Sequence, residues 1–194
     1  MATGFFEKYR HLFPFPGDRW DEYIGYYHRI EVPARTILLR EGEISRKAHF
    51  IEKGCLRAWF NSKGKDITFQ FFFEGQSVSS AESFRKRVPS ILTIETIEPC
   101  VLHWIGKEHL DKIMREIMEV PKLREQMTDI LFERQLTYMY QFLSFIKYTP
   151  QERYEQLVKE RPDLVRRVPQ QYIASYLGIT PVSLSRIRGK LSRS

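Results

Sequence analysis

The spacing of hydrophobic positions changes twice along the chain, which gives three successive regions. Residues 5–28 repeat apolar side chains at the i, i+3, i+4 and i+7 spacing of an amphipathic helix. From about residue 31 to residue 105 the period falls to two, which is typical of strands with one buried face. From residue 107 onward the helical spacing returns. The apolar positions of the first helix are Trp20, Tyr23, Ile24 and Tyr27, with Asp18 as its expected N-cap.

The central region contains short segments rich in β-branched and aromatic residues, separated by turn signals that contain glycine. Many short strands at this spacing predict a sandwich or small barrel. The expected strands lie within residues 36–39, 49–52, 56–60, 67–73, 91–97 and 101–105. The expected turns lie at residues 41–43, 53–54, 61–64 and 74–76.

A helix of about seven turns is predicted over residues 122–147, and its apolar side chains occupy more than one side. One side can pack within the chain. The simplest partner for the other side is the same helix of a second copy of the chain. The alternative is a helix that is buried wholly within one subunit. The predicted dimer seam consists of Met127, Ile130, Leu136, Met139 and Leu143.

Two short helices joined by a tight turn are predicted near the C-terminus. Pro169 opens the first helix, Gly178 supplies the turn, and Thr180 caps a second helix that starts at Pro181. Leu184, Ile187 and Leu191 share the inward face of the second helix at helical spacing. The pattern predicts a helix-turn-helix.

Positive charge is concentrated in the same segment, since residues 164–194 contain six Arg or Lys and no Asp or Glu, in a chain of net charge +7. A basic second helix that begins with small polar residues suits reading of the DNA major groove. An ordinary solvated helical hairpin is the plainer alternative, and a module that contacts protein is another. The predicted DNA-binding residues are Gln171, Thr180, Pro181, Val182, Ser183, Ser185, Arg186, Arg188 and Lys190.

Composition narrows the class of protein further. The 194 residues are 42% hydrophobic and 14% aromatic, enough to bury a core in one large or two modest domains. Cys55 and Cys100 are the two cysteines, which fits a reducing compartment. The N-terminal residues carry charges where a signal peptide needs an apolar stretch, and the most apolar run, residues 67–73, is too short for a membrane span. A cytoplasmic protein with no membrane association is expected.

The order of a β-barrel, a long helix and a helix-turn-helix resembles the Crp–Fnr superfamily of bacterial transcription regulators. Residues 32–43 and 50–58 look like the opening strands of the family's sensor domain, and residues 171–187 are similar to its helix-turn-helix over their full length. Residues 148–154 also resemble the segment that follows the family's dimer helix.

The resemblance implies an α+β fold, in which an N-terminal β-barrel or jelly roll of the cyclic-nucleotide-binding, cupin-like type is followed by a dimerisation helix and a small C-terminal helix-turn-helix domain. The corresponding expected domains are residues 1–115, 116–147 and 148–194. The resemblance also implies a homodimer that binds a near-palindromic operator in double-stranded DNA, with RNA polymerase as a further partner.

The match to the family fails at the effector site. Cyclic-AMP-binding members carry a Gly-Glu pair for the ribose and an Arg-Ser pair for the phosphate and base. Here Ala81 precedes Glu82, and Pro89 precedes Ser90, so the arginine that neutralises the phosphate is missing. A buried phosphate needs a charge partner. The standard cyclic-AMP response is therefore not expected, unless Arg85 or Arg87 folds into a cavity near Glu82 and Ser90.

Other chemistries find little support in the residues. An iron–sulfur cluster needs about four cysteines, and haem or zinc sites need suitably placed histidines. The five histidines are scattered, without a His-x-His pair. No catalytic residue, metal or cofactor is predicted, and the chain is not expected to be an enzyme. A metal-dependent β-barrel enzyme is the alternative that a chelation assay with metal analysis would test.

Overall fold

A computed structural model of the chain describes residues 3–12, 15 and 17–192. The chain divides into two compact units. The first holds residues 1–60 and 71–126, and the second holds residues 61–70 and 127–194. Residues 61–70 therefore belong with the C-terminal half, although the neighbouring residues on both sides belong to the first unit.

The described residues of the N-terminal segment form three short helical pieces, where the sequence predicted one helix over residues 5–28. They are α1 (Thr3–Glu7), a 3-10 turn (Arg10–Leu12) and α2 (Gly17–Gly25). That prediction was wrong because Pro14 and Pro16 interrupt the periodic pattern, and a proline cannot supply the backbone N–H that an α-helix needs. The expected apolar face still packs inward, since Trp20, Tyr23 and Ile24 are buried.

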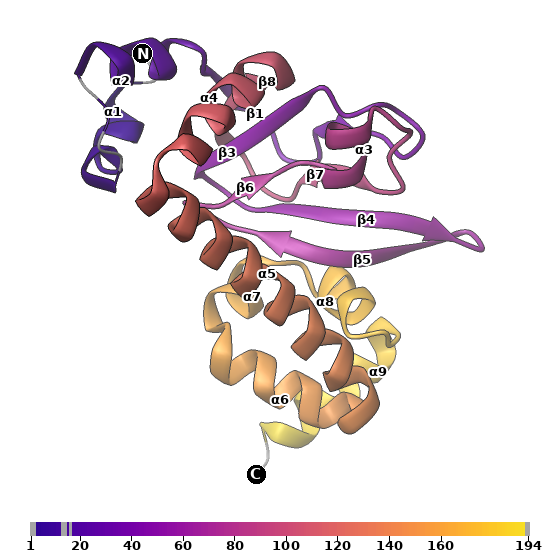
Figure 1. Ribbon diagram of the computed structural model, residues 1–194. Coiled ribbons are helices and arrows are strands. Elements are labelled where there is room, and N and C mark those ends of the chain that lie inside the picture. Colours follow the sequence, from indigo (N-terminus) through magenta and orange to yellow (C-terminus); the bar gives the residue numbers. More distant parts are fainter. Residues whose placement is uncertain (1–2, 13–14, 16, 193–194) are drawn as a thin grey trace. The chain divides into compact units, whose positions relative to one another are not determined.

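Within the part of the chain that the structure describes, eight strands form two four-stranded sheets (Figure 1). One sheet has the order β1-β8-β3-β6 and the other β2-β7-β4-β5. The strands are β1 (His28–Val32), β2 (Ile37–Leu39), β3 (Lys47–Lys53), β4 (Leu56–Ser62), β5 (Lys65–Phe72), β6 (Ser77–Val78), β7 (Thr93–Thr96) and β8 (Cys100–Gly106). β1 and β6 were absent from the sequence prediction, and so was the short helix α3 (Ala81–Lys86).

The core of the first unit follows from the alternation of side chains along these strands. Leu56 and Ile94 lie on the buried face of β4 and β7, and they pack with Ile51 and Leu102 in one apolar cluster. A second cluster places Ile113 and other apolar residues of α4 (Lys107–Glu119) against β8 and α2. The predicted fold class, a β-rich sensor-like domain followed by helices, is confirmed.

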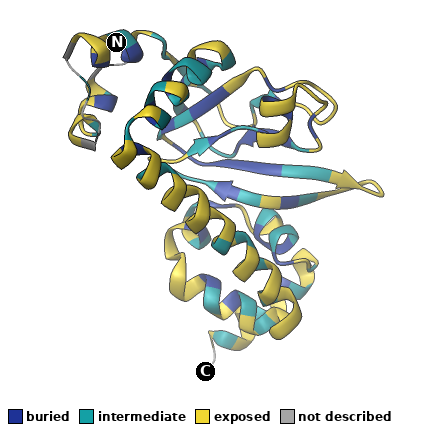
Figure 2. Cartoon of the chain, viewed as in Figure 1, coloured by how far each residue is buried: buried dark blue, intermediate teal, exposed yellow. Residues whose placement is uncertain are grey.

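The long helix α5 runs from Pro121 to Lys147. It begins one residue after the C-cap of α4, Val120, at a proline, which favours the first position of a helix. The expected boundary at residues 115/116 falls inside α4. Figure 2 shows that α5 is exposed along most of its length, and Leu123 is its one buried residue.

Four helices complete the second unit, namely α6 (Pro150–Glu160), α7 (Pro162–Arg167), α8 (Gln170–Tyr176) and α9 (Pro181–Leu191). Thr149 and Glu152 cap α6 reciprocally in a capping box, which fixes its start directly after α5. Buried side chains from all four helices form the core of this part. Within the described residues, no helix combines the length and the apolar character needed to cross a membrane.

Candidate nucleic-acid interface and effector region

The turn between α8 and α9 is built from the residues that the sequence singled out. Gly178 has a φ of +70°, a left-handed conformation that costs glycine little. A Cβ at this position would lie 3.3 Å from the ring of Phe145, so a larger residue would also meet α5. The side chain of Thr180 accepts a hydrogen bond from the backbone N–H of Ser183 at 3.1 Å and so caps α9.

α9 presents one face to the protein and the opposite face to solvent. Leu184 is fully buried, and Ile187 and Leu191 are half-buried beside it, as the spacing predicted. Val182, Arg186 and Gly189 are exposed and follow one another at i, i+4 and i+7. Because this spacing returns to the same side of a helix, these three residues form a single stripe opposite Leu184.

The other predicted contact residues lie beside this stripe. The Ser183 hydroxyl is half-buried and lies 2.9 Å from the hydroxyl of Thr180, so it contributes to the cap. Arg188 is exposed and lines a surface groove with Tyr154 and Val158 of α6. It therefore flanks the stripe and does not lie on it. Pro181 and Gln171, like Ser185 and Lys190, are exposed.

An ion pair neutralises part of the positive charge of this region. Arg166 donates a hydrogen bond to Asp163 at 2.5 Å on the exposed surface of α7. Lys190 donates to the side-chain oxygen of Gln151 at 3.3 Å. The sixth basic residue, Arg193, lies outside the described residues. α9 itself carries three exposed basic side chains, Arg186, Arg188 and Lys190.

The hairpin of β4 and β5 forms hydrogen bonds to the helix-turn-helix, and no pattern in the sequence predicted them. The Ser175 hydroxyl of α8 donates to the backbone oxygen of Asp66 and accepts from the backbone N–H of Thr68, both at 2.8 Å. The Gln141 side chain donates to the backbone oxygen of Phe69 at 3.1 Å. Residues 61–70 thereby belong to the second unit. No local sequence signal could have identified contacts between residues so far apart.

The hairpin of β4 and β5 ends in a tight two-residue turn. Lys63 and Gly64 have φ values of +53° and +78°. Two consecutive positive φ values are typical of the two-residue turn that matches the natural twist of paired strands. The side-chain oxygen of Asn61 accepts a hydrogen bond from the backbone N–H of Gly64 at 3.1 Å and stabilises the turn.

The residues expected to form an effector pocket differ in burial and have local hydrogen-bond partners. Glu82 is exposed on α3, and its carboxylate accepts a hydrogen bond from Lys86 at 2.9 Å, which holds the pKa of Glu82 below its usual value. Arg85 and Arg87 are exposed. Ser90 is buried, but its hydroxyl donates to the backbone oxygen of Leu92 in a local turn. Ser90 is therefore the only buried residue of the four, whereas Glu82, Arg85 and Arg87 are all exposed.

A buried ion pair that the sequence analysis missed lies on the second sheet. Arg57 of β4 donates through Nε and Nη2 to one carboxylate oxygen of Glu95 on β7, at 3.0 and 2.8 Å. The two residues are direct cross-strand partners. The guanidinium also lies over the ring of Trp59, 4.9 Å from its centroid. In this pair the buried guanidinium of Arg57 is neutralised by a carboxylate of the first unit itself.

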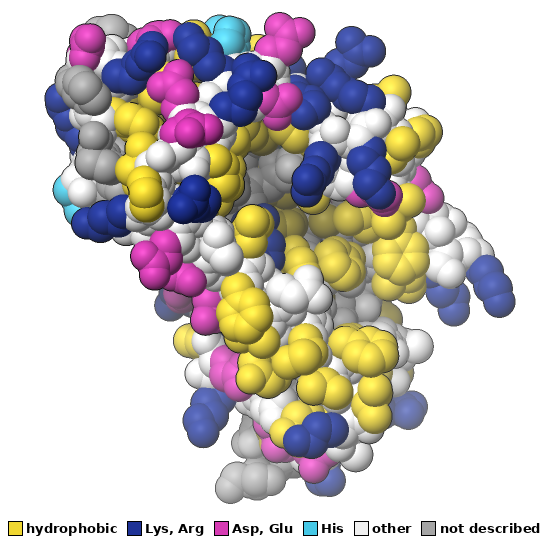
Figure 3. Space-filling model, viewed as in Figure 1, with side chains coloured by type: hydrophobic (Ala, Val, Ile, Leu, Met, Phe, Trp, Pro, Cys, Tyr) yellow, Lys and Arg dark blue, Asp and Glu magenta, His cyan; other side chains and the backbone are white. Residues whose placement is uncertain are grey.

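α5 carries exposed apolar side chains on more than one side, and Figure 3 shows hydrophobic side chains gathered along it. At 100° per residue, Ile130 and Met139 are nine positions apart and so lie on opposite sides of the helix. Met127 is half-buried within the chain. One partner helix cannot cover the whole predicted seam. The residues that do share the side of Met139 are Phe132, Leu136, Leu143 and Ile146, four of these five being exposed.

Comparisons with known proteins agree with this architecture. Residues 29–117 match the sequence profile of the cyclic nucleotide-binding domain. Three solved structures with similar folds are the c-di-GMP responsive global regulator CLP of Xanthomonas campestris, FixK2 of Bradyrhizobium japonicum and the catabolite activator protein of Thermus thermophilus. No curated protein matches the sequence.

The regulator CLP shares 18% identity, with a TM-score of 0.70 and 92% of each chain covered. FixK2 shares 15% identity, with a TM-score of 0.71 and coverage of 86% of this chain and 85% of the other. The catabolite activator protein also shares 15%, with a TM-score of 0.53 and coverage of 94% and 86%. Residues 29–117 thus match the cyclic nucleotide-binding domain, and the chain shares its fold with these three proteins, as the resemblance seen in the sequence implied.

Proposed function

We propose that the chain is a homodimeric transcription regulator that binds a near-palindromic operator through α9, with RNA polymerase as a further partner, and that it acts in the cytoplasm. The observation that carries the proposal is the exposed stripe of Val182, Arg186 and Gly189 on a capped helix whose opposite face is anchored by Leu184. The fold of the similar regulators supports it.

The stripe suggests how sequence would be read. The guanidinium of Arg186 can donate two hydrogen bonds to a guanine edge, and the side chain of Val182 suits the methyl group of a thymine. Arg188 and Lys190, at the flanks, suit phosphate contacts, which position a protein without specifying sequence. Two copies of α9 would lie about 34 Å apart, one turn of DNA, across a two-fold axis.

An Arg186→Ala variant should lose about 1–3 kcal/mol of operator binding and should discriminate less at one base pair. The operator is first located by footprinting on genomic fragments, and affinities are then compared at fixed salt concentration. Arg166→Ala is the matched control, because Arg166 is also exposed but is paired with Asp163 on α7. Unchanged operator affinity in the Arg186 variant would remove this side chain from the reading face.

Footprinting also separates the proposal from its main alternative. If the helix-turn-helix contacts a protein instead of DNA, the purified chain protects no genomic fragment. Protection of two half-sites related by a two-fold axis supports the dimeric DNA-binding regulator.

We further propose that the sensor-like unit does not give the standard cyclic-AMP response. Arg85 and Arg87 are exposed and Glu82 is paired with Lys86, so a buried phosphate would lack its charge partner. Isothermal titration with cyclic AMP and cyclic GMP should give weak binding or none. A sub-micromolar constant that Arg87→Ala abolishes would mean that the site has been rebuilt around Arg87.

A further inference from the structure

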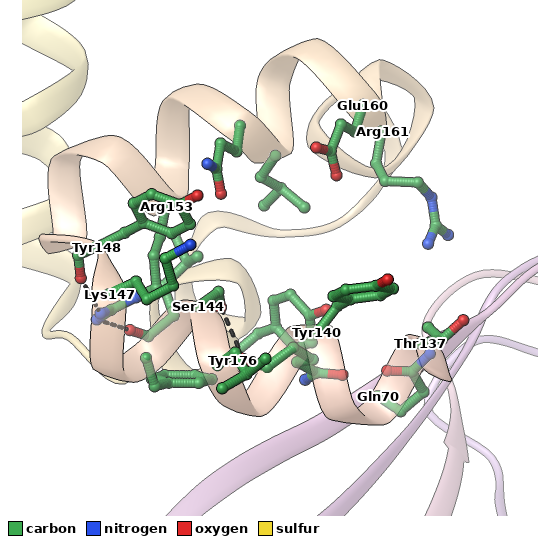
Figure 4. Close-up of a pocket in the computed structure, with 16 residues that line it drawn as sticks. Gln70, Thr137, Tyr140, Ser144, Lys147, Tyr148, Arg153, Glu160, Arg161 and Tyr176 are labelled. Carbon is green, nitrogen blue, oxygen red and sulfur yellow. Dashed lines mark hydrogen bonds between the residues drawn. The ribbon is translucent and has the colours of Figure 1, made fainter. Parts of the chain in front are cut away.

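The second unit contains a cavity of about 540 Å³ that the DNA-binding proposal does not use (Figure 4). Its walls come from the C-terminal half of α5, from α6 and from the end of α8. The volume lies within the range of pockets that hold small molecules. Three tyrosines, Tyr140, Tyr148 and Tyr176, and three cationic residues, Lys147, Arg153 and Arg161, stand among its lining residues, with Glu160 as the one carboxylate.

Arg153 is the group that points to a ligand. It is half-buried, and its Nη1 and Nη2 donate to the backbone oxygens of Tyr148 and Leu177 at 2.8 and 2.9 Å. Its Nε is buried without a hydrogen-bond partner. Within the described part of the chain, no carboxylate forms an ion pair with it, and burial lowers the pKa of Arg153 from its ordinary value. A desolvated cation without a counter-charge is costly, and an anion in the cavity would remove that cost.

The charges along the cavity give the ligand an orientation. Figure 4 places Lys147 and Arg153 near one another at one end, while Glu160 and Arg161 lie at the other. The Lys147 ammonium lies over the ring of Tyr148, 5.6 Å from its centroid, and forms no ion pair with a described residue. An anionic group is therefore favoured at the end that holds Lys147 and Arg153.

The remaining lining favours a flat ring attached to that anionic group. Tyr140 and Tyr176 supply aromatic surface between the two ends (Figure 4), and the ring of Phe145 lies under the guanidinium of Arg153, 4.6 Å from its centroid. The Gln70 side-chain oxygen is buried without a hydrogen-bond partner at the far end, where a ring N–H or hydroxyl would satisfy it. Few, well-placed polar groups within aromatic walls are typical of small-molecule sites.

We propose that this cavity binds a planar organic anion, an aromatic or heteroaromatic carboxylate, with its carboxylate at Lys147 and Arg153 and its ring between the tyrosines. Arginine has five N–H donors, and the two backbone oxygens use only two of them, so Arg153 can still donate to a carboxylate. This site lies in the second unit, and its lining does not include Glu82, Arg85, Arg87 or Ser90.

The test uses the intact protein with 2-naphthoate as the anionic probe and 2-naphthamide as its neutral counterpart, measured by isothermal titration without DNA. We expect one naphthoate to bind per chain and naphthamide to bind at least tenfold more weakly. Arg153→Met should weaken naphthoate binding at least tenfold, whereas Arg166→Met, an exposed arginine outside the cavity, should leave it unchanged.

Three results would overturn the proposal: no saturable naphthoate binding, equal affinity for the two probes, or unchanged binding by a folded Arg153→Met variant. Because Arg153 also links Tyr148 to Leu177, circular dichroism must show that this variant folds. If it does not fold, the exposed Lys147→Met variant decides, and naphthoate binding at the unaltered affinity overturns the site. The measurement involves no operator, so it succeeds or fails independently of the DNA-binding proposal.

Discussion

A Met139→Asp variant should sediment as a monomer at micromolar concentration and should lose most of its operator affinity. Met139 lies at the centre of the exposed apolar side of α5, with Leu136 and Leu143 one turn away on either side. In a two-fold seam the substitution buries two carboxylates without partners, which costs far more than a surface contact can return. Without the seam, each half-site is bound separately, and the gain from joining them is lost.

Ile130→Asp is the matched control for the seam. Ile130 is on the same helix and is comparably exposed, 56% against 42% for Met139, but it lies on the opposite side. The Ile130→Asp variant should remain dimeric if the seam follows Phe132, Leu136, Met139, Leu143 and Ile146. A monomeric unaltered protein would contradict the dimer proposal, and a monomeric Ile130 variant beside a dimeric Met139 variant would place the seam on the other side of α5.

An Arg57→Met variant should lose about 3–5 kcal/mol of unfolding free energy, because it leaves the Glu95 carboxylate buried without its partner. The side chains of Arg57 and Glu95 are 4% and 12% exposed, so water cannot replace the lost contact well. Urea denaturation measures the change. The double variant Arg57→Met with Glu95→Leu should recover most of the loss, because apolar replacements often equal a buried ion pair.

Lys86→Met serves as the control for the buried pair. Lys86 forms an ion pair with Glu82 of similar length, but both side chains are more than half exposed, and solvent-exposed pairs contribute little. Its urea midpoint should stay unchanged. If the Arg57 variant were as stable as this control, the ion pair would have no structural weight, and a double variant no more stable than Arg57→Met would show that shape, not charge, is decisive.

Elements with local signals were predictable from the sequence. The turn at Gly178 and the cap at Thr180 depend on conformations and hydrogen bonds within a few residues. The residue types at these positions therefore predict both features. The strands of the central region also follow from alternation over single segments. β1 was missed because the helical spacing of Tyr23 and Tyr27 continues up to the residue where the strand begins at His28.

Features that depend on distant partners were not predictable. β6 has two residues and exists because Val78 pairs with His49 of β3. The Arg57–Glu95 pair needs the register of β4 and β7, which no local pattern specifies. Within the candidate interface, the charge of α9 was visible in the sequence. That Arg188 lies beside α6, off the exposed stripe, depends on how the helices of the second unit pack.

The hydrogen bonds of Ser175 to the hairpin carry a consequence for the order of folding. Ser175 and Asp66 are 109 residues apart, so the entropy of closing a long loop must be overcome before this contact forms. During synthesis the hairpin is made before α8, so its hydrogen bonds to Ser175 can form only after α8 has been made. A fragment of residues 148–194 would lack this strand altogether and leave the Ser175 hydroxyl to water. The C-terminal helices are thus not a self-contained module, because part of their hydrogen bonding comes from a strand 109 residues earlier in the chain.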